Sequence, residues 1–358
     1  MIFISPLILP DHYYLHLYLS DKAIESFDNF VENKNEFLEF DPIVGWRNQP
    51  NSGRGKWQID EYGARNTHSI DLHSTDKTRV LFLGNSLTNG GMGISGNETI
   101  SAYIEDSSIE TMNFATMLYS LDQSYLAYKH YLSKYNAQII VVGLSGDPTA
   151  GLTNRYVPFW TPSEENMPII KPRFKFNSDS LTLIEVPPLQ IYKNILNNSE
   201  LLHQLSETDG YYKDFFAFKL FGLTPITYSG WYIFKRGLNF VNLTNKNYNN
   251  LNLLVSIMHQ LRNCVKSHGA KIIFMILPSS QTTSENVWRK YLPDQYASMI
   301  NFLKKENFII LDARKVLRES GKPLWKLYGE DESHYSAEGN YIIAMGLKKT
   351  INAIYDNR

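Results

Sequence analysis

Five short runs of mainly apolar residues are spaced along the chain, and polar or turn-forming residues bound each of them. All but the second, which is weaker, are continuous runs that do not alternate with polar residues. That pattern is typical of strands buried on both faces of a parallel sheet. The predicted strands are residues 79–83, 111–114, 137–143, 271–277 and 308–311.

Amphipathic helical patterns lie between and after these runs, with apolar residues three or four positions apart. The predicted helices are residues 122–134, 251–266 and 337–355. Strands and helices alternate, so we expect right-handed crossovers and an α/β fold: a three-layer α/β/α sandwich around a five-stranded parallel sheet. The expected strand order is 2-1-3-4-5, as in the flavodoxin-like doubly wound plan.

Two segments do not follow this alternation, and they suggest the domain organisation. Residues 1–75 are mixed in character, and we expect them to form a lead-in segment that packs on the core. The core itself is expected to comprise residues 76–150 and 251–358. Residues 151–250 are too long for an ordinary connection, so we interpret them as an inserted cap or side lobe, partly helical. Their many aromatic side chains are more often core than binding surface, although any that face a cleft could stack on sugar rings or hold an acyl chain.

Composition narrows the class of protein. The 358 residues are 43% hydrophobic and carry a net charge of -1, which supports a sizeable core and argues against a strong field for nucleic acid or anionic membranes. A single cysteine, Cys264, excludes an internal disulfide framework and a multi-cysteine metal site. The apolar run 1–10 is interrupted by Pro6, is too short to span a bilayer and lacks a basic flank. We therefore expect no membrane segment and no signal peptide, with the cytoplasm as the default compartment and an extracytoplasmic one left open.

A serine follows the first predicted strand in the turn Gly84–Asn85–Ser86–Leu87. Open α/β sheets place their ligands at such turns, and a serine exposed on a tight bend there can act as a nucleophile. It needs a base, because a protonated hydroxyl is a weak nucleophile. The alternative interpretation is a turn serine that caps the next helix.

The candidate base lies near the other end of the chain, in the stretch 331–340. Asp331 stands three residues before His334, so its carboxylate can turn back and accept the Nδ1–H of the imidazole. Nε2 is then free to take a proton from a serine. The alternative is a surface Asp-x-x-His before a helix, which is common by chance.

Together the two motifs resemble those of the SGNH/GDSL hydrolase family. Residues 84–87 are similar to its serine block, and DESHYSAEGN at 331–340 is similar to its last block. The resemblance implies that Ser86 is the nucleophile, His334 the base and Asp331 the third member of a triad. Upstream stretches at 41–51 and 62–65 resemble the lead-in of larger bacterial members.

The sequence departs from the family pattern around the oxyanion. Asn85 replaces the usual Asp before the serine, Leu118 falls at the position of an oxyanion glycine, and Gly146 falls at that of an oxyanion Asn. Positive φ at Leu118 would be strained, although its N–H could still donate. We expect the N–H of Ser86, with the Leu118 region and Asn85, to hold the oxyanion. The side-chain amides that could compensate are those of Asn85, Asn89 and Asn154.

The predicted function is a serine-dependent ester hydrolase or O-acyltransferase without cofactor or metal. The resemblance suggests acetyl or short acyl esters of a carbohydrate as substrates. Two alternatives stay open: a catalytically impaired domain that binds a glycan or a protein partner, and a lipase or thioesterase. The G-x-G-x-x-G match at 91–96 begins several residues after the strand, so we expect no dinucleotide site there. The pair His12 and His16 has no carboxylate partner, so surface or packing roles are expected.

Overall fold

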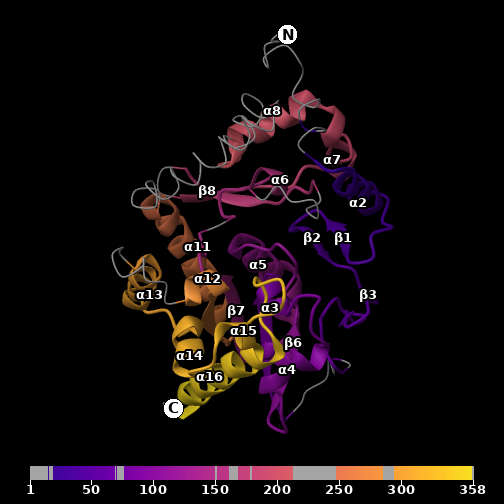
Figure 1. Cartoon of the computed structure of the whole chain (residues 1–358). Helices are drawn as coiled ribbons and strands as arrows, with labels where there is room; N and C mark the ends of the chain where they lie inside the picture. Colours follow the sequence, from indigo (N-terminus) through magenta and orange to yellow (C-terminus); the bar gives the residue numbers. More distant parts are fainter. Residues whose placement is uncertain are drawn as a thin grey trace. The chain divides into compact units, whose positions relative to one another are not determined.

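The computed structural model describes residues 15, 19–68, 70, 76–149, 151–160, 168–177, 180–212, 247–284 and 294–356. The chain divides into two compact units (Figure 1). The first unit comprises Met1–Arg47 and Gly151–Leu254, and the second comprises Asn48–Ala150 and Val255–Arg358. His12, His16 and residues 213–246 of the predicted cap lie outside the described residues.

The second unit is built on a five-stranded parallel sheet. Its order, β11-β10-β7-β5-β6, confirms the predicted 2-1-3-4-5 arrangement. Each strand overlaps the apolar run that predicted it. The strands are β5 (Thr78–Gly84), β6 (Ile109–Asn113), β7 (Ile139–Ser145), β10 (Lys271–Leu277) and β11 (Ile310–Asp312).

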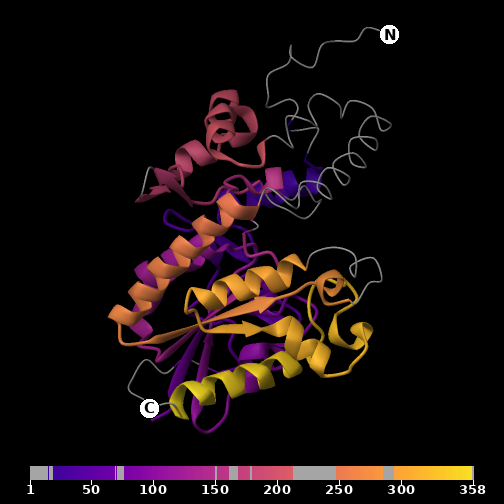
Figure 2. The same cartoon turned by 90° about the vertical axis from the view of Figure 1, so that its left-hand side faces the viewer.

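Helices cover both faces of this sheet, which confirms the predicted three-layer sandwich. Alternate strand residues such as Val80 and Phe82 pack on one face against α4 (Ile100–Ile104), α14 (Ala313–Glu319) and α16 (Ala337–Asp356). In Figure 2, α16 runs along that face, whereas the other face carries the part of α11 (Asn247–Ser267) from Val255 onward and α13 (Gln295–Lys305). The predicted helix at 122–134 is instead α5 (Leu121–Ala127) continued by a π turn (Tyr128–Leu132) and a 3₁₀ turn (Ser133–Tyr135).

Short elements occupy the connections of this unit. The two-residue strands β3 (Gly53–Arg54) and β4 (Trp57–Gln58) pair as a small antiparallel ladder in the lead-in. The remaining short helices are α3 (Ser86–Asn89), a 3₁₀ turn (Gly96–Glu98), α12 (Ser280–Thr283) and α15 (Leu324–Leu327).

The first unit has its own small elements. Helix α2 (Asp21–Val31) begins at Ser20, whose hydroxyl accepts from the Ala23 N–H. The strands are the pair β1 (Leu38–Asp41) and β2 (Gly45–Asn48) and the hairpin β8 (Arg173–Asn177) and β9 (Ser180–Ile184). The other helical pieces are α6 (Val157–Trp160), α7 (Leu189–Tyr192), a 3₁₀ turn (Ile195–Asn197) and α8 (Ser199–Thr208). The interpretation of 151–250 as a cap stays a prediction.

Across the described residues of both units, no helix is long and apolar enough to cross a membrane.

Candidate active site

Ser86 is the first residue of α3, at the carboxyl edge of the parallel sheet. Asn85 caps this helix: its Oδ1 accepts from the Leu87 N–H at 3.0 Å. Two glycines let the helix sit directly on the strand ends. A Cβ at Gly84, where φ is +140°, would lie 2.4 Å from the Gly143 carbonyl oxygen, and a Cβ at Gly143 would lie 1.8 Å from Thr88 Oγ1. The bare backbone at both positions therefore allows the close approach that fixes Ser86.

The structure brings together the three side chains that the sequence motifs singled out. His334 Nε2 lies 2.9 Å from Ser86 Oγ, and His334 Nδ1 lies 2.6 Å from Asp331 Oδ2. Asp331 also accepts the N–H groups of Ser333 at 3.0 Å and His334 at 2.9 Å through Oδ1. Nε2 thus faces Ser86, whereas Nδ1 faces the carboxylate and, at 3.1 Å, the Ser333 hydroxyl as well.

The charge state of Asp331 fixes the direction of these hydrogen bonds. Burial alone would raise the pKa of Asp331, but the hydrogen bonds from the His334 backbone and imidazole and from Ser333 outweigh it and hold the pKa at about 2. The ionised carboxylate can only accept, so the Nδ1–H of a neutral imidazole donates to it. Nε2 then carries the lone pair, and the Ser86 hydroxyl donates to Nε2.

The loop that carries His334 is closed at its base and anchored to the sheet. Tyr328 and Tyr335 form a β-bridge, and the Gly329 N–H donates to the His334 carbonyl at 2.8 Å. Both tyrosine hydroxyls donate to the buried carbonyl of Pro278, which follows β10 directly, at 2.9 and 2.6 Å. The base is therefore held by a rigid connection to the sheet.

Two backbone N–H groups near Ser86 are candidate oxyanion donors. Leu118 has φ +62°, so it adopts the left-handed conformation that a glycine would take without strain. The segment before it is tied to β5, because the Thr116 N–H donates to the Gly84 carbonyl at 2.9 Å. Within the described part of the chain, neither the Ser86 N–H nor the Leu118 N–H has an acceptor.

The side-chain amides suggested by the sequence behave differently from one another. The Asn85 Nδ2 has no acceptor among the described residues, so this amide stays available. Asn89 is fully buried and donates to the Ala115 carbonyl at 2.8 Å. Asn154, in the first unit, uses its Nδ2 on Tyr156 and Asp209. Neither of these two amides is free to hold an oxyanion.

Gly146 offers no side-chain amide, and its surroundings are tight. A Cβ there would lie 3.1 Å from the Cα of Pro278. The corner that in the family pattern would hold an Asn is thus occupied by the backbone that anchors the His334 loop.

Sequence reasoning missed two residues that adjoin this site. Gly91 lies against the imidazole: a Cβ there would come within 2.9 Å of His334 Cδ2. Arg65, which is 1% exposed, donates to the carbonyl of Gly91. The lead-in stretch 62–65 contains this arginine, but its burial and its contact with Gly91 depend on the tertiary fold and have no signal in the sequence. Within the described chain, no group of three or more His, Cys, Asp or Glu side chains gathers as metal ligands do.

No protein-family model matches the chain, and no curated protein is similar to it in sequence. Solved structures of the GDSL family are among those similar to it. A protein described as lipolytic and of the G-D-S-L family, from Desulfitobacterium hafniense, is 13% identical with a TM-score of 0.39, over 76% of this chain and 99% of that one. A catalytic mutant of the acetylxylan esterase Axe2 from Geobacillus stearothermophilus is 12% identical with a TM-score of 0.40, over 76% and 94%. A GDSL-like lipase from Bacteroides thetaiotaomicron is 12% identical with a TM-score of 0.39, over 80% and 93%.

Proposed function

We propose that this protein is a serine-dependent enzyme acting on carboxylic esters, with Ser86 as nucleophile, His334 as general base and Asp331 as the residue that orients the base. The observation that carries the proposal is the continuous hydrogen-bond relay from Asp331 through His334 to Ser86, with contacts of 2.6 and 2.9 Å. These contacts lie within the range for proton transfer between a nucleophile and its base.

The proposed reaction uses only groups of this chain and water or an alcohol. Ser86 Oγ attacks the ester carbonyl carbon while its proton passes to His334 Nε2, and Asp331 stabilises the imidazolium. The tetrahedral oxyanion is held by the N–H groups of Ser86 and Leu118, aided by the Asn85 amide. The C–O bond to the leaving alcohol breaks as His334 returns the proton to it. Water or a second alcohol, deprotonated by His334, then attacks the acyl carbon; the bond to Ser86 Oγ breaks as His334 returns that proton to Oγ, which regenerates the free serine.

For substrates, we infer acetyl or short acyl esters of a carbohydrate, because the serine and histidine blocks resemble those of the SGNH/GDSL family. Water as acceptor makes the protein an esterase, and a sugar hydroxyl makes it an O-acyltransferase. Faster hydrolysis of acetyl than of octanoyl nitrophenyl esters would support this substrate class. The opposite preference would support the lipase or thioesterase alternative.

A second candidate is a binding domain that has lost catalysis. The observation that favours it is the oxyanion side, where Gly146 lacks an amide and Leu118 is strained. Loss of one oxyanion donor typically costs about 100–1,000-fold in turnover. The same observation predicts a slow enzyme if the triad is functional.

The deciding experiment measures initial hydrolysis of nitrophenyl acetate and labelling by a fluorophosphonate. Wild type, Ser86→Ala and His334→Ala are compared, with Ser267→Ala as a control for loss of a serine hydroxyl that bonds only to the Cys264 carbonyl. We expect wild type and the control to label and to turn over, and the two triad variants to fall to background. Wild-type protein that neither labels nor exceeds Ser86→Ala would overturn the enzyme assignment in favour of the binding domain.

A further inference from the structure

We propose that Arg65 is a positioning residue for catalysis, which holds the Gly90–Ile94 loop as the wall against which the His334 imidazole rests. The inference deepens the proposed function and rests on it. It assigns a role to the N-terminal lead-in that the sequence did not suggest: the lead-in sets the geometry of the base.

The Arg65 guanidinium donates hydrogen bonds to three backbone carbonyls at the end of α3 and in the loop that follows it. Its Nη1 donates to the carbonyls of Asn89 at 3.1 Å and Gly91 at 2.5 Å, and its Nη2 donates to the carbonyl of Ile94 at 2.6 Å. All three acceptors belong to buried residues. Because the loop has no regular structure of its own, this planar fork supplies the donors that its carbonyls need.

Further contacts secure the lead-in to the nucleophile block. Trp57 Nε1 donates to Asn89 Oδ1 at 2.8 Å, and the Arg65 N–H donates to the Asn113 carbonyl at 2.8 Å. Arg65 itself stays charged at neutral pH: burial lowers its pKa to about 10, and the nearby Glu98 carboxylate opposes that decrease. The loop is therefore held by a cation that belongs to the lead-in.

The loop contacts the His334 imidazole through one residue, Gly91. Gly91 has φ +67°, and a Cβ there would come within 2.9 Å of His334 Cδ2 and 3.0 Å of Cγ. The bare backbone thus lies directly against the ring. Any movement of Gly91 changes the space available to an imidazole whose hydrogen-bond partners are Ser86, Asp331 and the Ser333 hydroxyl. Displacement of a reacting group by about 1 Å can cost 100-fold in rate.

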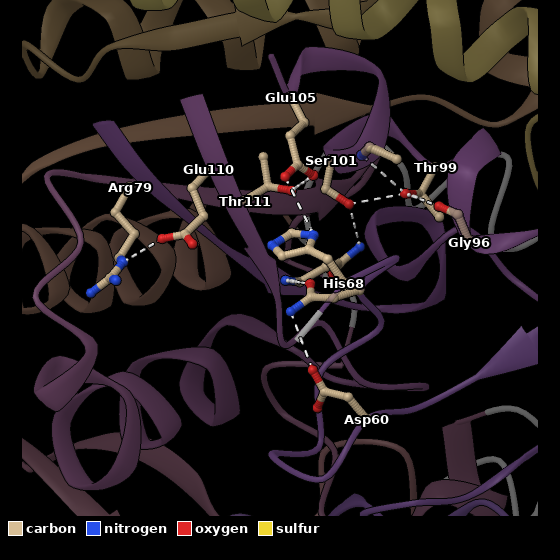
Figure 3. A network of polar contacts seen from close by, with 12 residues as sticks. Asp60, His68, Arg79, Gly96, Thr99, Ser101, Glu105, Glu110 and Thr111 are labelled. Atoms are coloured by element: carbon tan, nitrogen blue, oxygen red, sulfur yellow. Dashed lines mark hydrogen bonds and ion pairs between the residues drawn. The ribbon is translucent and has the colours of Figure 1, made fainter. Parts of the chain in front are cut away.

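Arg79 provides a matched control in the same unit. It is also a buried arginine, 5% exposed, and its Nε donates to Glu110 at 2.6 Å, as Figure 3 shows. It stands near the start of β5, whereas Ser86 follows the end of that strand. Replacing Arg79 removes a buried guanidinium that donates to Glu110 and to the Tyr135 carbonyl, at the other end of β5 from Ser86.

The experiment compares Arg65→Lys, Gly91→Ala, the double variant and Arg79→Lys with wild type, measuring kcat, KM, Tm and the downfield NMR resonance of the His334 Nδ1–H. A lysine keeps the charge but cannot reproduce the fork. We expect Arg65→Lys and Gly91→Ala each to lower kcat about 10–100-fold with KM within twofold, and to shift the resonance. The double variant should lose less than the product of the two, since both act on one contact. Arg79→Lys should lower Tm and leave kcat and the resonance unchanged.

The outcomes separate this inference from the proposed function. If wild type is active and Arg65→Lys keeps kcat within threefold, the positioning role is wrong and the esterase assignment stands. Equal loss of kcat in Arg79→Lys would also overturn the role. If wild type shows no serine-dependent turnover, the proposed function fails, and the NMR resonance alone decides whether Arg65 positions His334. Should Arg65→Lys not fold, Gly91→Ala tests the same contact with the arginine intact.

Discussion

The hydroxyl of Tyr335 donates to the carbonyl oxygen of Pro278 at 2.6 Å, directly linking the residue after the catalytic histidine candidate to the end of β10. Burial raises the pKa of Tyr335, so its hydroxyl remains a donor. Tyr328 makes a second hydrogen bond to the same carbonyl at 2.9 Å. A single buried oxygen therefore holds both sides of the loop that carries His334.

Removing both of these donors should cost more than the sum of removing each alone. Tyr335→Phe leaves Pro278 with one donor and should cost about 1 kcal/mol of unfolding free energy. Tyr328→Phe should cost somewhat more, because it also removes the 2.7 Å partner of the buried Thr283 hydroxyl. The double variant leaves the buried carbonyl unsatisfied, so it should lose more than the sum of the two. Chemical denaturation of the four proteins measures this. Strict additivity would show that the shared carbonyl is not what couples them.

The conformation of Leu118 predicts the order in which substitutions at this position lower stability and kcat. Leu118→Gly keeps φ near +62° without strain, whereas Leu118→Val places a β-branched residue in the left-handed region. Leucine already bears about 1–2 kcal/mol of left-handed strain, and we expect the β-branched valine variant to be less stable still and to lower kcat, because its N–H moves. The glycine variant should retain kcat. Tm and kcat with nitrophenyl acetate provide the test, and a valine variant as active as wild type would contradict the oxyanion role of this N–H.

The close contact between Gly143 and Thr88 can be tested with variants of both residues. Gly143→Ala would force a Cβ within 1.8 Å of Thr88 Oγ1 and should destabilise the protein by about 1–3 kcal/mol. Thr88→Ala removes that hydroxyl and should restore part of the loss, since the Thr88 Cβ itself stays within 2.9 Å. A thermal unfolding series of wild type, both single variants and the double variant checks it. No rescue by the threonine variant would place the strain elsewhere.

The pH dependence of catalysis should not report the Asp331 carboxylate. The pKa of Asp331 lies at about 2, so its charge is present above that pH and is lost only as the pH falls through about 2. Between about pH 4 and 8, this carboxylate should therefore add no proton to the acid limb of kcat/KM, whose slope should correspond to at most one proton. Asp331→Asn should keep that slope and lower the plateau roughly 100–10,000-fold. A two-proton acid limb in wild type would contradict the assignment.

The sheet was predictable because its signal is local. The run Lys271–Leu277 is β10 residue for residue, since the six buried residues that follow Lys271 leave no room for polar alternation. The flavodoxin-like doubly wound plan then supplied the strand order. The helix expected at 122–134 was less accurate, because its apolar spacing does not reveal the π turn at Tyr128–Leu132.

The candidate site was predictable only where a motif encodes geometry. Asp331 and His334 form their contact within one turn of chain, so their spacing was informative. The contact between Arg65 and the Gly90–Ile94 loop depends on the tertiary fold, so no motif or residue spacing in the sequence indicates it. The same limit applies to Asn89. The sequence suggested its side-chain amide as an oxyanion donor, but in the structure this amide is buried and donates to the Ala115 carbonyl.

The hydrogen bond between Ser86 and His334 joins residues 248 positions apart. During synthesis, the serine therefore exists for most of the time on a chain that has no base for it, and an unassisted serine hydroxyl is a weak nucleophile. Under the proposed function, Ser86 becomes reactive only when the last strand, the histidine loop and α16 have assembled on the sheet. The rate at which a fluorophosphonate labels Ser86 should then report the completion of folding, and a chain truncated before His334 should not be labelled.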